Sequence, residues 1–130
     1  MDAIPIVAIA ILIAAGMFLL RASRHAGRPA KGERGLTPAY CEHAGGRFDG
    51  VNWTIPFVRI ATFDEFVSIS CVTHEIILKN GDVTKIERER HLFSVGLRLD
   101  HHRPDLPKTI LLWPCDTDRL EAALRASLLS

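Results

Sequence analysis

Hydrophobic residues fall into two zones of the chain, an unbroken N-terminal run and a series of short alternating segments after residue 46. Residues 3–20 form a run of eighteen residues without a charge. With a rise of about 1.5 Å per residue, such a helix would extend roughly 27 Å, close to the hydrocarbon core thickness of about 30 Å. Apolar residues cover all faces of this run, unlike the single stripe of a surface amphipathic helix. The pattern predicts a transmembrane helix over residues 1–20.

Two other interpretations of this run are weaker. A cleaved signal peptide would have a basic start and a small-residue cleavage site, whereas this chain begins Met1-Asp2 and the run ends at Arg21. A buried core helix would usually keep a polar face. The small residues Ala8, Ala15 and Gly16 permit close helix packing, but they form no Gly-x-x-x-Gly motif. The run is therefore interpreted as an uncleaved, single-pass signal anchor in contact with the lipid bilayer.

The charges beside this run predict its orientation. Five basic residues form a membrane-proximal cluster in the segment that follows: Arg21, Arg24, Arg28, Lys31 and Arg34. Under the positive-inside rule, such a flank stays in the cytoplasm. The prediction is a protein of a bacterial inner (plasma) membrane, with its N-terminus outside and its remaining residues inside. Residues 21–46, which contain glycine and proline, are predicted to be a linker.

The third predicted region, residues 47–130, is a small domain of about seven short antiparallel strands and a C-terminal amphipathic helix. The strands are predicted from alternating or β-branched runs at 47–53, 55–63, 66–72, 75–78, 83–90, 94–100 and 109–113. A tight turn is expected at Asn80-Gly81-Asp82. Asp116 is a candidate N-cap for the helix, in which Leu120, Leu124 and neighbouring apolar residues recur at helical spacing. The fold class is therefore α+β, mainly β.

This order of elements resembles the small pleckstrin-homology-like (PH-like) domains of bacterial membrane proteins. The resemblance rests on Pro56 to Arg59, on Phe66 to Cys71, on Ile76 through Ile86, and on the strand at Ile110 to Leu112 that precedes the helix. It implies a barrel or sandwich of seven strands, capped at its open end by the C-terminal helix. Many PH domains bind phosphoinositides through basic residues of the first strands. Here residues 47–59 contain two arginines, one acid and no lysine, which does not favour headgroup binding.

Charge and cysteine content narrow the possible functions. Residues 47–130 contain eleven Lys and Arg residues against twelve Asp and Glu residues, so the domain is nearly neutral. A neutral domain offers no cationic face to nucleic acid, and no nucleic-acid partner is predicted. The three cysteines have no repeated spacing and are typical of a reducing compartment.

Candidate catalytic chemistry is limited to Cys41, His43, Cys71 and His74. The chain has no Cys-x-x-Cys, His-Glu-x-x-His, Gly-x-Ser-x-Gly or glycine-rich phosphate-binding motif. No catalytic residue, metal ligand or cofactor is therefore assigned. A metal- or thiol-dependent enzyme built from these four residues remains an alternative hypothesis.

Trp53 and Trp113 are the candidate contact aromatics, because a tryptophan that is not used in the core often marks an interface. The favoured hypothesis is a membrane-anchored, non-enzymatic interaction or scaffold module with a protein partner. Its partner would add a strand to a free sheet edge or place a helix in a groove. The other alternative is a membrane-anchored module for a lipid or small ligand. The sequence leaves the oligomeric state open.

Overall fold

The computed structural model describes residues 4–26, 31–33, 35–72 and 74–129. They form an N-terminal helix, a short 3-10 helix, seven strands and a C-terminal helix. In chain order these are α1 (Ile4–Ala26), η1 (Lys31–Glu33), β1 (Tyr40–Phe48), β2 (Val51–Thr62), β3 (Phe66–Ser70), β4 (Glu75–Lys79), β5 (Val83–Arg90), β6 (Val95–His101), β7 (Ile110–Trp113) and α2 (Thr117–Leu128).

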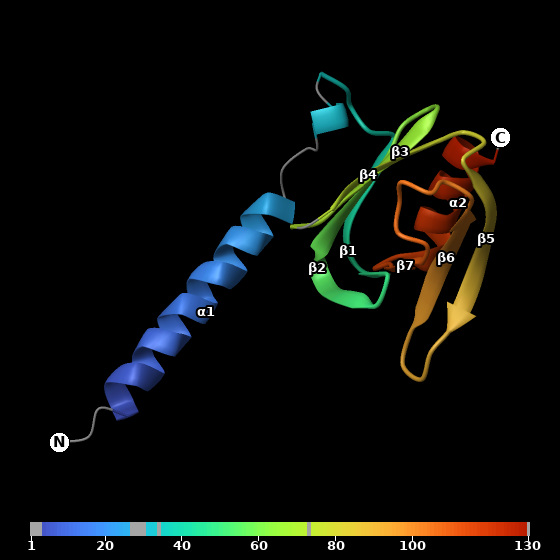
Figure 1. Cartoon of the computed structure of the whole chain (residues 1–130). Coiled ribbons are helices and arrows are strands. Elements are labelled where there is room, and N and C mark those ends of the chain that lie inside the picture. Colours follow the sequence, from blue (N-terminus) through green and yellow to red (C-terminus); the bar gives the residue numbers. More distant parts are fainter. Residues whose placement is uncertain (1–3, 27–30, 34, 73, 130) are drawn as a thin grey trace.

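The seven strands form one antiparallel sheet with the order β4-β3-β2-β1-β7-β6-β5. Strands β1 to β4 are one meander and β5 to β7 are another, and the two meanders join where β1 pairs with β7. The sheet curls around its buried face, and α2 lies against the inside of the curl (Figure 1). The mainly β character expected from the sequence is therefore present.

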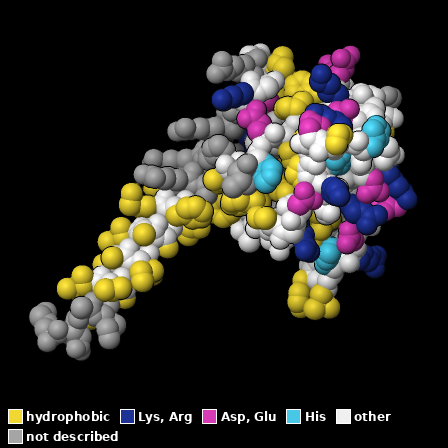
Figure 2. All heavy atoms as spheres, in the orientation of Figure 1, with side chains coloured by type: hydrophobic (Ala, Val, Ile, Leu, Met, Phe, Trp, Pro, Cys, Tyr) yellow, Lys and Arg dark blue, Asp and Glu magenta, His cyan; other side chains and the backbone are white. Residues whose placement is uncertain are grey.

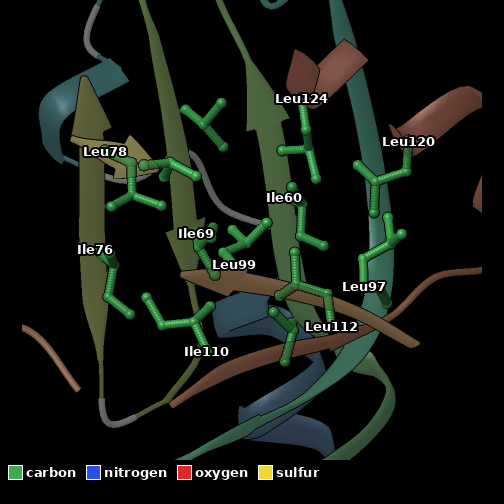
Figure 3. Packing of buried hydrophobic residues seen from close by; sticks show 14 of the residues in the cluster. Ile60, Ile69, Ile76, Leu78, Leu97, Leu99, Ile110, Leu112, Leu120 and Leu124 are labelled. Atoms are coloured by element: carbon green, nitrogen blue, oxygen red, sulfur yellow. The ribbon is translucent and has the colours of Figure 1, made fainter. Parts of the chain in front are cut away.

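The core lies between the curled sheet and α2. Every strand contributes at least one buried apolar side chain, and Leu120, Leu124 and Leu128 of α2 complete the cluster. These three leucines are four residues apart and so lie on one face of the helix. Figure 3 shows Leu120 and Leu124 beside core residues of the strands, such as Ile60. Asp116 caps α2, since its carboxylate accepts a hydrogen bond of 3.1 Å from the Arg119 N–H. The predicted helix, its cap and its buried face are all confirmed.

The predicted turn at Asn80-Gly81-Asp82 is present, but it does not join paired strands. Gly81 has φ +92°, and the Asp82 N–H donates to the Lys79 carbonyl over 2.9 Å. However, β4 and β5 lie at opposite ends of the strand order. The turn therefore carries the chain from one meander to the other, and its Gly81 N–H also reaches the Leu128 carbonyl at the end of α2.

The prediction for the first strand is wrong. The sequence pattern placed it at residues 47–53, whereas β1 runs from Tyr40 to Phe48 and the chain turns at Asp49-Gly50. Part of the predicted linker therefore belongs to the sheet. The reason is that β1 contains Glu42, two glycines and Arg47 in place of an apolar alternation, and long-range pairing with β2 and β7 holds it in the sheet.

Residues 51–62 form one bent strand where the sequence suggested two. Gly46 pairs with Trp53 but Ala44 pairs with Val58, so residues 54–57 of β2 bow out opposite Gly45. The Ile55–Pro56 peptide bond in this stretch is cis. A Cβ on Gly45 would lie only 2.7 Å from the Trp53 carbonyl oxygen, so only glycine fits here without displacing the backbone. This bulge is where the sheet bends.

The prediction of a transmembrane helix is wrong. Within the residues that the structure describes, no helix is both long enough and apolar enough to cross a membrane. The uncharged part of α1 from Ile4 to Leu20 covers about 26 Å at a rise of about 1.5 Å per residue, which is at the lower limit of the length of a spanning helix. The predicted single-pass placement in an inner membrane, and the orientation that follows from it, are therefore corrected.

Helix α1 nevertheless leaves its apolar side chains in contact with solvent. It extends away from the sheet (Figure 1), and large hydrophobic residues along it, such as Leu12 and Phe18, are more than half exposed. Of the basic cluster, Lys31 is exposed in η1. Arg28 and Arg34 lie outside the described residues, as do the side chains of Arg21 and Arg24.

The 3-10 helix η1 is held to the sheet by a buried ion pair. The Glu33 carboxylate pairs with the Arg59 guanidinium of β2, and their side chains are 1% and 8% exposed. The Gly32 N–H also lies 3.3 Å from a carboxylate oxygen of Glu75 on β4. These contacts fix η1 against the sheet.

Removing only one partner of this ion pair is expected to be costly. Arg59→Met leaves the Glu33 carboxylate buried without its counter-charge, and the free energy of unfolding should fall by about 3–5 kcal/mol. In the double variant Arg59→Met/Glu33→Leu no uncompensated charge remains, so most of that loss should be recovered. Urea titration of the three proteins measures both values, and a double variant as unstable as Arg59→Met would contradict the assignment.

Candidate interaction surface

The turn between β5 and β6 presents two large hydrophobic side chains to solvent. Leu92 and Phe93 are 88% and 95% exposed, the highest values among the large hydrophobic residues described. The turn is tight, because the His91 N–H donates to the Ser94 carbonyl over 2.8 Å and Ser94 donates back over 3.4 Å. Figure 2 shows a hydrophobic patch at the end of the domain where Figure 1 places this turn. Two-residue hairpin turns usually contain Gly, Asn or Asp, so bulky apolar residues here need another explanation.

An aromatic pair lies at the base of this turn. The rings of His91 and Trp113 meet edge to face, with centroids 4.5 Å apart. Alternation along β7 puts Leu112 into the core and turns Leu111 and Trp113 to the outer face of the sheet. Gly96 of β6 makes room for both, since a Cβ there would lie 2.9 Å from Leu111 Cδ1 and 3.3 Å from the Trp113 ring. The half-buried Trp113 is thereby held rigidly beside the turn.

A shallow hollow of about 370 Å³ continues from this aromatic pair across the outer face. Cross-strand pairing sets Arg47 of β1 beside Leu111 of β7, and Leu111 beside Arg98 of β6. The hollow is lined by Arg47, Asp49, Gly50, Glu89, His91, Arg98, Thr109 and Leu111. We call Leu92, Phe93, His91, Trp113 and the lining of this hollow the tip surface.

Most charges at the tip surface are already matched within the chain. The Arg98 guanidinium lies 2.7 Å from Glu87 and 3.3 Å from Asp100, and the His91 ring lies 3.6 Å from the Glu89 carboxylate. One Asp49 oxygen accepts the Thr109 N–H over 3.0 Å. Arg47 differs, because its guanidinium is exposed and has no ion pair among the residues described.

A larger hollow, of about 640 Å³, lies between η1 and the strands β3 and β4. The large apolar side chains in its lining, Phe66 and Ile77, are half-buried. The tip surface, where Leu92 and Phe93 are almost fully exposed, is the stronger candidate.

The two predicted contact aromatics have different environments. Trp113 belongs to the tip surface. Trp53 instead packs against the core, and its indole N–H is buried with no hydrogen-bond partner in the described part of the chain. Trp53 therefore acts in packing.

The four candidate catalytic residues do not converge. Cys41 is exposed on β1, whereas Cys71 is a member of the buried core. Cys71 and His74 close the turn between β3 and β4, where the Cys71 N–H donates to the His74 carbonyl over 2.9 Å. No group of three or more His, Cys, Asp or Glu residues within the described ranges is placed to hold a metal ion. The proposed Cys/His set is thus divided between the outside and the inside of the sheet.

The environment of the exposed thiols opposes thiolate chemistry. Burial raises the pKa of the Cys41 thiol. The positive charge of Arg59 lowers this pKa, whereas the carboxylates of Glu33 and Glu42 raise it. Burial and then Glu42 raise the pKa of Cys115. A reactive cysteine needs a lowered pKa, so these two thiols are inert by this criterion.

A polar cluster joins the start of β1 to the start of α2. Glu42 accepts the Tyr40 hydroxyl over 3.2 Å and the Cys115 N–H over 2.7 Å, and the Arg119 guanidinium lies over the Tyr40 ring. Burial and the Glu42 carboxylate raise the pKa of Tyr40 to about 12. The hydroxyl therefore stays protonated and serves as a donor in a structural joint.

The sequence did not indicate the most exposed part of the tip surface. Leu92 and Phe93 were left between two predicted strands without a role. The available signal was a pair of large apolar residues in a turn that has no glycine or proline between Arg90 and Ser94. Arg47 was placed on a strand, but its position beside Leu111 depends on pairing between residues far apart in sequence.

No protein-family model matches the chain, and no curated protein or solved structure is significantly similar to it.

The titration of Tyr40 tests the joint between β1 and α2. The chain has a single tyrosine, so tyrosinate absorbance reports on this residue alone. The midpoint should lie near 12 in the folded protein and return to about 10 in denaturant. Because the folded pKa is raised, its contribution to stability is complete below about pH 10 and is lost as the pH rises towards 12. Tyr40→Phe should remove this part of the pH dependence, and a folded midpoint near 10 would contradict the hydrogen bond to Glu42.

Proposed function

We propose that this chain is a non-enzymatic protein-binding module that uses the tip surface to contact its partner. The observation that carries the proposal is the exposure of Leu92 and Phe93 on a tight turn, directly beside the half-buried Trp113. Exposed apolar side chains gain free energy when a partner covers them, about 1.5–3 kcal/mol for each one fully buried. Tryptophan and arginine are also the residue types that most often dominate binding energy.

Rigidity of the tip surface supports the same proposal. Leu92 and Phe93 are carried by a hairpin whose two ends are hydrogen-bonded, and Trp113 is packed against His91 and the Gly96 backbone. A surface that is already ordered loses little conformational entropy on binding, so more of the contact energy appears as affinity.

The free edge of β5 is a weaker candidate for partner binding. Side chains of α2 cover part of it, because Arg125 donates to the Ile86 carbonyl over 3.0 Å and Arg88 pairs with Asp118 and Glu121 over 2.6 Å each. An added strand would have to displace these contacts. We therefore favour binding through side chains at the tip surface over addition of a strand at β5.

We also propose that the domain is PH-like. The support is the antiparallel order β4-β3-β2-β1-β7-β6-β5, together with a C-terminal helix that packs inside the curl. A likeness of fold does not identify a ligand, because one fold carries many functions.

Crosslinking from the tip tests the proposed function. A photoreactive residue at position 93 of the full chain should form a saturable crosslink to a protein, and Leu92→Ser/Phe93→Ser should abolish binding of that protein. Since both side chains are exposed, the double variant should change the free energy of unfolding by no more than about 0.5 kcal/mol.

Leu36→Ser is the matched control, because Leu36 is also an exposed leucine but is outside the tip surface. It precedes β1 and lies near the turn that joins β2 to β3, at Phe63 to Phe66. This variant should retain binding. Equal binding by the wild-type chain and the Leu92→Ser/Phe93→Ser variant would refute the proposal, and so would a crosslink that forms only to lipid.

A further inference from the structure

The tip surface suggests what kind of segment it binds, an inference that rests on the proposed function. The turn itself is small, since two side chains cannot supply the roughly 800 Å² per partner of a standard interface. A partner that covers Leu92 and Phe93 must extend over neighbouring residues. The adjoining outer face offers Trp113 and then the hollow that ends at Arg47.

Charge complementarity distinguishes the far end of this hollow from the rest. The Arg98 guanidinium and the His91 ring already have carboxylates within 4 Å, so a ligand anion would have to compete for them. The Arg47 guanidinium has no such partner in the described ranges. Asp49, the nearest acid in sequence, uses one oxygen to accept the Thr109 N–H and so holds the β1–β2 turn.

Leu111 is the apolar neighbour of Arg47 on the outer face. Leu111 is only 4% exposed although it is not part of the main core cluster, and it lies between Arg47 and Arg98 on the outer face. A carboxylate that reaches Arg47 here would be partly shielded from water. Hydrogen bonds to charged groups in such a setting contribute more than those at a fully solvated rim.

We propose that the tip surface binds a protein segment that combines bulky apolar side chains with an acidic residue. The apolar side chains cover Leu92, Phe93 and Trp113, and the carboxylate pairs with Arg47. Strand residues i and i+2 on one face are about 7 Å apart, and the His91 and Arg47 rows are two such steps apart along the sheet. Arg47 also lies three strands away from β5, about 14 Å across the sheet at a spacing of about 4.8 Å per strand. A segment of at least about six extended residues is therefore needed to reach from one to the other.

The composition of the face argues against other occupants. Nucleic acid would meet the carboxylates of Glu87, Glu89 and Asp100 on the same outer face. A second copy of the chain would have to provide an exposed acid next to apolar residues, and the tip presents Leu92 and Phe93 next to His91 and Arg90 instead.

Selection from a displayed library of random ten-residue peptides on the immobilised full chain tests this inference. Peptides enriched on the wild-type chain should carry Asp or Glu together with Leu, Phe, Trp or Ile. Arg47→Glu should weaken the best peptide by at least about tenfold, as expected for the loss of a charged hydrogen-bonded pair. Exchange of the peptide acid for lysine should restore binding to Arg47→Glu but not to the wild-type chain.

Arg90→Glu is the matched control. Arg90 is also exposed and without an ion pair among the residues described, but alternation along β5 puts it on the other face from His91 and Glu89. The Arg90→Glu substitution should change the affinity for the selected peptide by less than about twofold, as expected for a charge at the rim of an interface. Equal losses for Arg47→Glu and Arg90→Glu, or enriched peptides without an acid, would overturn the inference.

Different results would contradict the proposed binding through the tip surface and the proposed recognition of an acidic residue by Arg47. If Leu92→Ser/Phe93→Ser abolishes peptide selection while Arg47→Glu has no effect, the proposed function stands and the acidic segment is wrong. If the double variant selects the same peptides as the wild-type chain, both are wrong. Self-association that depends on Leu92 and Phe93 in sedimentation equilibrium, but not on Arg47, would assign the surface to a second copy and overturn the acidic segment.

Discussion

Strand β1 hydrogen-bonds to β2 along most of its length and to β7 through its last four residues. Without the second pairing, no strand pairing within the described residues would join the meander β1 to β4 to the meander β5 to β7. The bulge at Gly45 lets β1 serve both, because the backbone of β2 approaches there more closely than any side chain would allow. The curl of the sheet, the enclosed core and the outer face that carries Arg47 all depend on this shared strand.

Electrostatics then decide which parts of the surface remain open to a partner. Five of the eight arginines whose side chains the structure describes form internal pairs: Arg59 with Glu33, Arg88 with Asp118 and Glu121, Arg98 with Glu87 and Asp100, Arg103 with Asp82 and Asp105, and Arg125 with Glu121. Such pairs hold η1 to the sheet and join β5 to α2. A near-neutral domain can therefore still present an arginine without an internal ion pair, such as Arg47, at the edge of a surface hollow. Net charge, which excluded nucleic acid, carries no information about this pairing.

Helix α1 and the β5–β6 turn both expose apolar side chains, but they differ in kind. Helix α1 is apolar from Ile4 to Leu20, and its exposure follows from its projection away from the sheet (Figure 1). Leu92 and Phe93 are two residues on a rigid hairpin, flanked by polar strands and by an aromatic pair. Hydrophobicity states only that a side chain avoids water, and the geometry around it decides what can cover it. Only the hairpin is surrounded by groups of defined position and charge, which is why it supports a specific partner.

The sequence by itself determined the elements that local physics controls. The alternation in β6, the Asp116 cap and the leucine stripe of α2 were all predicted, since each depends on residues within a few positions of one another. It failed where distant residues decide the outcome. Strand β1 has a polar and glycine-rich sequence, and only its hydrogen bonds to β2 and β7 hold residues 40–46 in the sheet. The interpretation of the apolar run as a transmembrane helix was also wrong, since its uncharged length is only at the lower limit for a span. The tip surface, finally, joins Arg47, Arg98 and Trp113 from three strands, and no local pattern brings such residues together.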